Sequence, residues 1–459
     1  MEKVKNNEME DMNLKKLSIK MSIPMVISMI SLALYNLIDS IFVANIGTEA
    51  LTAISLSYPI QAIITALAIG TGIGINSLMS RKLGEKQTKT VHNVAMHGIL
   101  LTIVIYLIVA IYSVTLVRKT FMCFTQDLLT IQYSVDYLSI CLFFSVGLLF
   151  QILFQKISEA YGKTIYSMAI QLSGALINLI LDPILIYGLL GIPALGVKGA
   201  AIATVIGQTS GMILGFILLN KNCITFRIKK FKYNLKIIKD IYIVGLPTII
   251  SESMAAFVTL ILNKILISYS VFAVPFWGIY NKIQSFIFMI VYGFNYGMIP
   301  IVGYNYGAKK YDRMKETIRI FIVYEEIIMV IGVIIFMLFG NTIFGIYGAE
   351  KGIIDIGINA LRILSLGFIF AGVSLVLSSY FQAIGKGTYS LIIFMLRQLV
   401  INIPLIYLLQ NHATINTIWY IFVLSEIIAT AVSLILYKKQ VKNIFEKSTI
   451  MYPWLDKKY

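Results

Sequence analysis

The chain has 459 residues, of which 58% are hydrophobic and 13% charged, and its mean hydropathy is +0.84. An average soluble domain is much less apolar and carries about twice this charged fraction, so the composition excludes a water-soluble globular protein. The formal net charge of +16 would suggest nucleic acid in a soluble protein, but these basic residues lie between apolar segments, so no nucleic-acid partner is expected.

Apolar stretches long enough to cross a hydrocarbon core of ~30 Å recur along the whole chain. Twelve are found, at approximately residues 19–45, 50–79, 91–117, 134–156, 165–189, 199–219, 240–269, 275–303, 316–340, 355–381, 389–409 and 415–437. The sequence therefore predicts an all-α integral membrane protein with twelve transmembrane helices in the lipid bilayer.

Lys and Arg are distributed unevenly between the two sides of the predicted membrane protein. With the N-terminus inside, the inner segments hold 30 of the 38 Lys and Arg residues and the outer loops hold four. Cytoplasmic loops usually carry such an excess, so we expect both termini in the cytoplasm and the protein in the cell inner (plasma) membrane. The expected divisions are a cytoplasmic tail (1–18), a first six-helix lobe (19–220), a cytoplasmic linker (221–239), a second six-helix lobe (240–437) and a cytoplasmic tail (438–459).

The two halves of the chain repeat one another at a single offset. Adding 223 converts the first member of each of these pairs into the second: Pro24 and Pro247, Gln61 and Gln284, Gly70 and Gly293, Gly84 and Gly307, Gly162 and Gly385, Lys163 and Lys386. Prolines and helix-end Gly-Lys pairs at one offset indicate a duplication. Because each copy has six spans, both enter from the same side, and a pseudo-twofold axis along the membrane normal relates the two lobes.

Two acidic residues lie inside the apolar segments of the first copy. An Asp at the centre of a span costs ~2.5–3.5 kcal/mol on insertion scales, so such residues usually have a function. Asp39 and Asp182 precede the outer ends of their segments by similar distances, and we expect them at similar depth. Asn36 is three residues before Asp39 and Asn178 is four before Asp182, which places an amide and a carboxylate on one helix face in each case.

Two carboxylates close together in a low dielectric do not both stay ionised cheaply. A proton on one of them, or a bound Na⁺ held by the oxygens of Asp39, Asn178 and Asp182, relieves the repulsion. We therefore predict a site that exchanges H⁺ or Na⁺ for an organic cation. The alternative is that each Asp only caps or hydrogen-bonds a neighbouring helix. No cofactor, disulfide or other metal site is expected from the spacing of the Cys and His residues.

The second copy offers different polar candidates, namely Glu252, Gln284 and Arg397. An acid near a base within a membrane often marks a structural pair. We expect Arg397 to be neutralised by Glu252 or by Glu426.

Several stretches carry a resemblance to a known family. They are Tyr-Asn-Leu-Ile-Asp-Ser-Ile-Phe-Val (35–43), Ser-Arg-Lys-Leu-Gly (80–84), Leu-Asn-Leu-Ile-Leu-Asp-Pro-Ile-Leu-Ile-Tyr-Gly (177–188) and Gly-Tyr-Asn-Tyr-Gly-Ala-Lys-Lys-Tyr-Asp-Arg (303–313). On these, the chain resembles the multidrug and toxic compound extrusion transporters, over 24–437 and in their prokaryotic branch.

The resemblance implies a two-lobe antiporter that exports organic cations or toxic compounds in exchange for inward H⁺ or Na⁺. The duplicated design predicts rocker-switch alternating access between the lobes, and we expect a monomer. The resemblance also implies that Asp39 carries the coupling ion and that Asn178, Asp182 and Thr204 belong to the same site. Pro24 and Pro247 each remove a backbone hydrogen bond in the first helix of a lobe, and we expect them to act as hinges.

The main alternative is a lipid-linked oligosaccharide flippase of related architecture, which would place Lys or Arg in its central cavity. A major-facilitator transporter is disfavoured because Arg-Lys-Leu-Gly-Glu (81–85) stands where that class carries Asp-Arg-x-Gly-Arg. A membrane enzyme is disfavoured as well, because no nucleophile, base and orienting group converge in the sequence.

Overall fold

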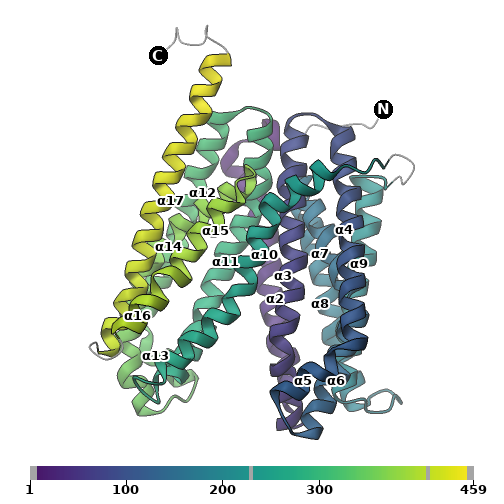
Figure 1. Ribbon diagram of the computed structural model, residues 1–459, viewed down its shortest axis with the longest axis vertical. Helices are drawn as coiled ribbons and strands as arrows, with labels where there is room; N and C mark the ends of the chain where they lie inside the picture. Colours follow the sequence, from purple (N-terminus) through teal and green to yellow (C-terminus); the bar gives the residue numbers. More distant parts are fainter. Residues whose placement is uncertain (1–7, 227–230, 410–413, 452–459) are drawn as a thin grey trace. The chain divides into compact units, whose positions relative to one another are not determined.

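The computed structural model describes residues 8–226, 231–409 and 414–451, and within these ranges the chain is helical and has no β-strand (Figure 1). The helices are α1 (Glu8–Asp11), α2 (Leu14–Ala44), α3 (Thr48–Gly84), α4 (Thr88–Thr115), α5 (Val117–Phe124), α6 (Leu128–Phe143), α7 (Val146–Ala160), α8 (Thr164–Tyr187), α9 (Val197–Asn222), α10 (Leu235–Leu266), α11 (Ala273–Gly307), α12 (Tyr311–Leu338), α13 (Gly340–Ile346), α14 (Lys351–Ala383), α15 (Gly387–Met395), the π-helix η2 (Leu396–Val400), α16 (Asn402–Leu409) and α17 (Ile415–Met451). Parts of the predicted tails and linker, at 1–7, 227–230 and 452–459, lie outside the described residues.

Eleven of the described helical segments are long and apolar enough to cross a membrane, and the pair α6 and α7 makes a twelfth span if it is counted as one. This confirms the predicted all-α class and the predicted number of spans. The fourth span differs from the expected single segment 134–156, because α6 ends at Phe143, α7 begins at Val146, and the two are bent by 48°. The residues at the break give no strong signal in the sequence, since neither Phe144 nor Ser145 is Gly or Pro.

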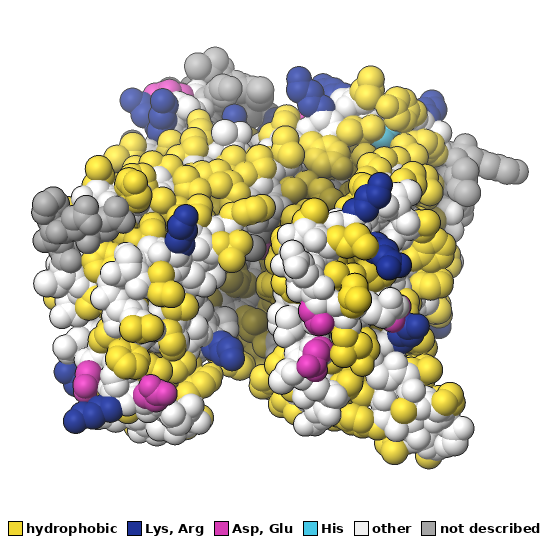
Figure 2. All heavy atoms as spheres, turned by 60° about the horizontal axis from the view of Figure 1, so that its bottom comes forward, with side chains coloured by type: hydrophobic (Ala, Val, Ile, Leu, Met, Phe, Trp, Pro, Cys, Tyr) yellow, Lys and Arg dark blue, Asp and Glu magenta, His cyan; other side chains and the backbone are white. Residues whose placement is uncertain are grey.

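On the face drawn in Figure 2, hydrophobic side chains cover large areas, and charged side chains lie in small separate patches. Ile108, Ile111 and Leu260 are each more than 60% exposed. Such exposure over many helices exceeds what a monomeric soluble protein shows, and it fits helices whose outer faces contact lipid.

Two compact units can be distinguished. Unit 1 contains Met1–Phe257, Ser285–Phe321 and Gln382–Gly387, and unit 2 contains Val258–Gln284, Ile322–Phe381 and Thr388–Tyr459. Unit 1 therefore includes the first copy together with parts of the second copy, and unit 2 consists of second-copy residues.

The repeat is visible in the backbone. Lys86 and Lys309 are 223 residues apart, and both adopt the left-handed region at φ 59°, which is unusual for a residue other than Gly. Gly162 and Gly385 are also 223 apart and follow helices with φ of 71° and 82°. The same helix ends therefore recur at equivalent positions of both copies.

Equivalent glycines allow helices to pack closely inside unit 1. We call Gly70, Gly74 and Gly84 of α3 with Gly293, Gly297 and Gly307 of α11 the glycine seam. A Cβ on Gly70 would lie 2.5 Å from Cγ1 of Ile249, and a Cβ on Gly293 would lie 2.6 Å from Cα of Val26. Because 249 is 26 plus 223, the two contacts are equivalent, and each joins one copy to the other. Small residues permit such approaches between membrane helices.

The N-terminal segment also connects the two copies within unit 1. The Glu10 carboxylate accepts hydrogen bonds from Tyr304 Oη at 3.0 Å and from Lys310 Nζ at 3.1 Å. Arg313 Nη2 donates to the backbone oxygens of Met9 and Met12, at 3.3 and 3.0 Å. Helix α1 is therefore attached to the end of α11 and the start of α12.

The glycine seam predicts a sharp difference between two Gly→Ala changes in α11. Gly293→Ala should lower the melting temperature of the purified protein, because overpacking costs about 1–3 kcal/mol. Gly278→Ala is the control, since a Cβ there meets nothing within 4 Å and Ala favours a helix. Thermal unfolding in detergent measures both, and equal melting temperatures would contradict the close approach.

The Glu10 contacts predict a pH dependence outside the membrane. Hydrogen bonds from Lys310 and Tyr304 hold the pKa of Glu10 below its usual value of 4.5. A lowered pKa means that the contact stabilises the attached state above pH 4.5 and is lost as the pH falls through the lowered pKa. A spin label near the N-terminus should therefore stay immobilised from neutral pH to about pH 5 and become mobile at still lower pH.

Glu10→Gln should make the same label mobile already at neutral pH, whereas Asp11→Asn, a matched change at the exposed neighbouring residue, should not. A label that stays immobile in Glu10→Gln would exclude an ionic attachment.

Candidate functional site

The two aspartates predicted from the first copy lie together inside unit 1. Asp39 of α2 is 8% exposed and Asp182 of α8 is fully buried. Their side chains are within hydrogen-bonding reach of each other. Two carboxylates are both acceptors, so this hydrogen bond forms only when one of them carries a proton and donates it to the other.

The cluster also contains an amide, from the turn of α8 before Asp182, and a hydroxyl from the neighbouring helix α9. Asn178 Nδ2 lies 3.2 Å from Asp182 Oδ1, to which it donates, and 3.4 Å from Thr204 Oγ1 of α9. Asn178 and Thr204 are 2% and 5% exposed. Helices α8 and α9 can approach because of Gly207, where a Cβ would lie 2.6 Å from the oxygen of Gly174 and 3.0 Å from Cβ of Asn178.

Three oxygens of this cluster are left over. Asp39 Oδ1, Asn178 Oδ1 and Asp182 Oδ2 are buried and accept no hydrogen bond from the described residues. A buried acceptor without a donor is costly, so the arrangement suits a ligand that supplies positive charge or a proton. Oxygens of carboxylate and amide groups are the ligands that a hard cation such as Na⁺ prefers.

Asn36 lies apart from this cluster. It is exposed, and among the described residues its side-chain amide donates no hydrogen bond to either carboxyl. Its backbone oxygen accepts from Ser40 Oγ at 2.8 Å. The three-residue spacing from Asp39 therefore does not bring this amide to the pair.

Polar residues that sequence reasoning did not single out surround the pair. The hydroxyl of Tyr35 lies near Thr204, and Gln61 of α3 lies near Tyr137 of α6. Tyr35 is four residues before Asp39, so helical spacing contained a signal for it. The sequence contained no such signal for Tyr137, because its neighbour Gln61 is 76 residues away along the chain.

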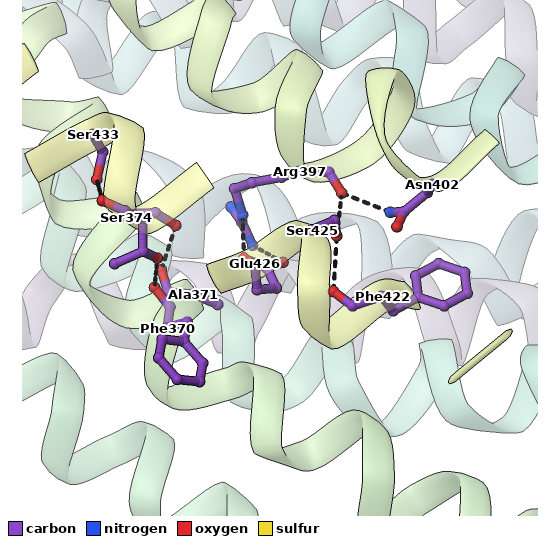
Figure 3. Close-up of polar contacts among 10 residues, drawn as sticks. Phe370, Ala371, Ser374, Arg397, Asn402, Phe422, Ser425, Glu426 and Ser433 are labelled. Atoms are coloured by element: carbon purple, nitrogen blue, oxygen red, sulfur yellow. Dashed lines mark hydrogen bonds and ion pairs between the residues drawn. The ribbon is translucent and has the colours of Figure 1, made fainter. Parts of the chain in front are cut away.

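The second copy holds a buried ion pair in unit 2 (Figure 3). Arg397 donates to both carboxylate oxygens of Glu426, with Nε at 2.8 Å and Nη2 at 2.9 Å. Asn402 Nδ2 and Ser425 Oγ donate to the backbone oxygen of Arg397, at 2.7 and 3.2 Å. Arg397 lies in η2, where the π-helical turn displaces backbone groups that these two side chains satisfy. Of the two expected partners, Glu426 is the one that Arg397 binds.

The remaining candidates are placed as follows. Glu252 lies in α10 of unit 1 with an exposed side chain. Gln284 lies in α11 near Tyr280, in unit 2. Pro24 and Pro247 lie inside α2 and α10, and both helices continue beyond them.

No group of three or more His, Cys, Asp or Glu that could hold a metal ion occurs in the part of the chain that the structure describes. An Na⁺ at the aspartate pair would therefore rely on the amide and hydroxyl oxygens as well as on the two carboxylates.

Comparisons with known proteins agree with this architecture. The MatE family model matches residues 24–184 and again 247–408, two ranges whose starts are 223 residues apart. The multidrug export protein MepA of Staphylococcus haemolyticus is 26% identical over 448 residues, which cover 96% of this chain and 97% of the relative.

Solved structures of similar proteins cover nearly the whole chain. A multidrug resistance MATE family transporter of the MOP superfamily in the outward-facing conformation has a TM-score of 0.90 at 25% identity, with 96% of this chain and 99% of that chain covered. A MATE in the bent conformation has a TM-score of 0.89 at 25% identity, with 95% and 97% covered.

The buried ion pair predicts a large effect of one substitution in α17. Glu426→Gln leaves the Arg397 charge buried without its carboxylate, which typically costs 3–5 kcal/mol, so the melting temperature should fall markedly. Glu446→Gln is the matched control on the same helix, because Glu446 is 58% exposed and its pairing with Lys442 is a surface contact worth about 0–1 kcal/mol. Similar melting temperatures for both variants would show that Glu426 does not stabilise the fold.

Proposed function

The chain belongs to the multidrug and toxic compound extrusion (MATE) family, and we propose that it is an antiporter that exports organic cations in exchange for inward H⁺ or Na⁺. Its family consists of multi-pass membrane transporters for multidrug efflux, not of enzymes. The exchange, the coupling ion and the cationic nature of the substrate are our proposal, as is a monomer in the plasma membrane with both termini in the cytoplasm.

One observation carries the proposal, namely the three buried acceptor oxygens of Asp39, Asn178 and Asp182. They come from two helices, α2 and α8, and Thr204 adds a hydroxyl from α9. A proton joins the two carboxyls directly, and an Na⁺ draws the oxygens together. Either ion therefore changes the attraction between α2 and α8, which makes the pair suitable for coupling ion binding to helix movement.

Pro24 supports a hinge in the same helix. Proline has no backbone N–H, so α2 lacks one of its usual backbone hydrogen bonds at Pro24 and bends more easily there. A related MATE has been solved in a bent conformation, which supports bending in a protein of this fold. We propose that ion binding at Asp39 bends α2, displaces the substrate outward and accompanies rocking of the lobes, with Pro247 as the equivalent hinge in α10.

Available driving forces are sufficient for such an exchange. Moving one charge through 100 mV is worth ~2.3 kcal/mol, and one pH unit adds ~1.4 kcal/mol. Together they sustain a concentration ratio of roughly 500-fold for each exchanged charge.

The alternative, a lipid-linked oligosaccharide flippase, gains no support from the buried cations. Such a protein would use positive charge to hold the phosphates of its substrate. Arg397 is held by Glu426, and Lys156 is held by Glu159 at 3.0 Å, so both charges are already neutralised.

Efflux from everted vesicles tests the antiport. Ethidium should move when a proton gradient or a sodium gradient is imposed, and Asp39→Asn and Asp182→Asn should each abolish the response to the coupling ion. Each pH unit of gradient is expected to raise the sustained ethidium ratio about tenfold for each exchanged proton in the unaltered protein.

Asp136→Asn is the control for this experiment, because Asp136 pairs with Lys198 at 3.4 Å and takes no part in the cluster. Wild-type efflux in both aspartate variants would show that the pair does not couple ion binding to transport. No ethidium movement by the unaltered protein under either gradient would favour the flippase.

A further inference from the structure

A second buried charged cluster lies in unit 1, near the end of α7. Lys156 and Glu159 are 5% and 1% exposed, and Lys156 Nζ lies 3.1 and 3.0 Å from the two carboxylate oxygens of Glu159. Two buried charges are costly to desolvate, and a pair is retained when further hydrogen bonds satisfy its remaining atoms.

The Glu159 carboxylate receives such bonds from two other helices of the first copy. Asn76 Nδ2 of α3 donates at 3.1 Å, and Ser167 Oγ of α8 donates at 3.0 Å. Asn76 is held in turn by Ser80, whose hydroxyl donates to Asn76 Oδ1 at 3.1 Å. The carboxylate is therefore fixed by first-copy residues alone.

The ammonium of Lys156 reaches the second copy instead. It lies 3.8 Å from the centroid of the Tyr296 ring in α11, a cation–π geometry. The approach of α3 beside this side chain requires Gly72, since a Cβ there would lie 2.7 Å from Lys156 Cγ. An electrostatic interaction also links Lys156 with Glu252 of α10, another second-copy helix.

The repeat does not reproduce this arrangement. Adding 223 to Lys156 and Glu159 gives Ser379 and Gln382, and subtracting 223 from Tyr296 gives Ile73. The glycine seam joins the copies by equivalent contacts on both sides, whereas the cation and the ring occur once. The equivalent contacts already pack the two copies together, so a contact that occurs once is not needed for that packing.

We propose that Lys156 is a positioning residue of the transport cycle, whose ammonium holds Tyr296 and thereby keeps α11 of the second copy closed against α3 and α7 of the first. The proposal rests on the proposed alternating access, in which the copies separate at the end of the bundle that carries the N-terminal segment. Glu159, Asn76 and Ser167 keep the ammonium in place, so the contact with Tyr296 is the one that breaks on opening.

A cysteine reporter measures this opening without any ion gradient or substrate. Ser77 is fully buried and donates to the backbone oxygens of Gln382 and Ala383, so Ser77→Cys should react with a maleimide only when the copies separate. The reporter is placed in the full chain after Cys123, Cys141 and Cys223 have been replaced. Because no transport is involved, the result is independent of whether the aspartate pair couples to H⁺ or Na⁺.

Tyr296→Leu removes the ring, and Tyr296→Phe retains it. We expect Tyr296→Leu to speed labelling of the reporter roughly ten- to thirty-fold, the range given by a desolvated cation–π contact, and Tyr296→Phe to stay within about twofold of the parent. Lys156→Met should speed labelling at least as much as Tyr296→Leu, because it also removes the interaction with Glu252, and adding Tyr296→Leu to Lys156→Met should have no further effect.

The melting temperature of each variant establishes whether it is folded. If Lys156→Met is unstable, the comparison of Tyr296→Leu with Tyr296→Phe decides the outcome. Equal labelling rates for Tyr296→Leu and Tyr296→Phe, or a parent rate in Tyr296→Leu, would overturn the proposal.

Discussion

Lipid offers no hydrogen bonds, and this constraint governs the whole molecule. The backbone meets it by forming helices, and polar side chains meet it by finding partners between helices. Glu159 accepts from three donors, and Arg397 is bound by two oxygens of Glu426. Asp39 and Asp182 each keep one buried carboxylate oxygen that accepts no hydrogen bond from the described residues, and our proposal assigns these oxygens to an ion.

Positions that are the same in the two copies and positions that differ have different roles in our interpretation. Equivalent glycines, helix ends and prolines supply a frame in which both copies pack alike. Chemistry is confined to positions where the copies differ: Asp39 and Asp182 have Leu262 and Leu405 as counterparts. In our proposal the ion acts at this pair, in the first copy alone.

The sequence was sufficient for the class of fold and the number of spans, because apolar length and a 223-residue offset are local or periodic signals, and four short stretches were sufficient for the resemblance to the family. Helical spacing also predicted that Asn178 accompanies Asp182. The same spacing was misleading at Asn36, whose amide lies exposed, because spacing fixes a helix face and not which neighbour covers it. The burial of Lys156 could not be predicted either: Glu159 is three residues away on the same helix, but Asn76 and Tyr296 come from two other helices that no local pattern connects to it.

The reciprocal contacts of the glycine seam have a consequence for the origin of the chain. Gly70 contacts Ile249, and Gly293 makes the equivalent contact with Val26. Each copy therefore uses the same pair of positions, a glycine and a residue 44 positions before it in the copy, to contact the other. This is the property of an isologous interface, the kind that holds a homodimer together. A six-helix ancestor carrying one such set of glycines would pair with a second molecule of itself through two identical contacts. Once two such copies are fused in one chain, each can change independently of the other, and this chain has aspartates at 39 and 182 but leucines at 262 and 405.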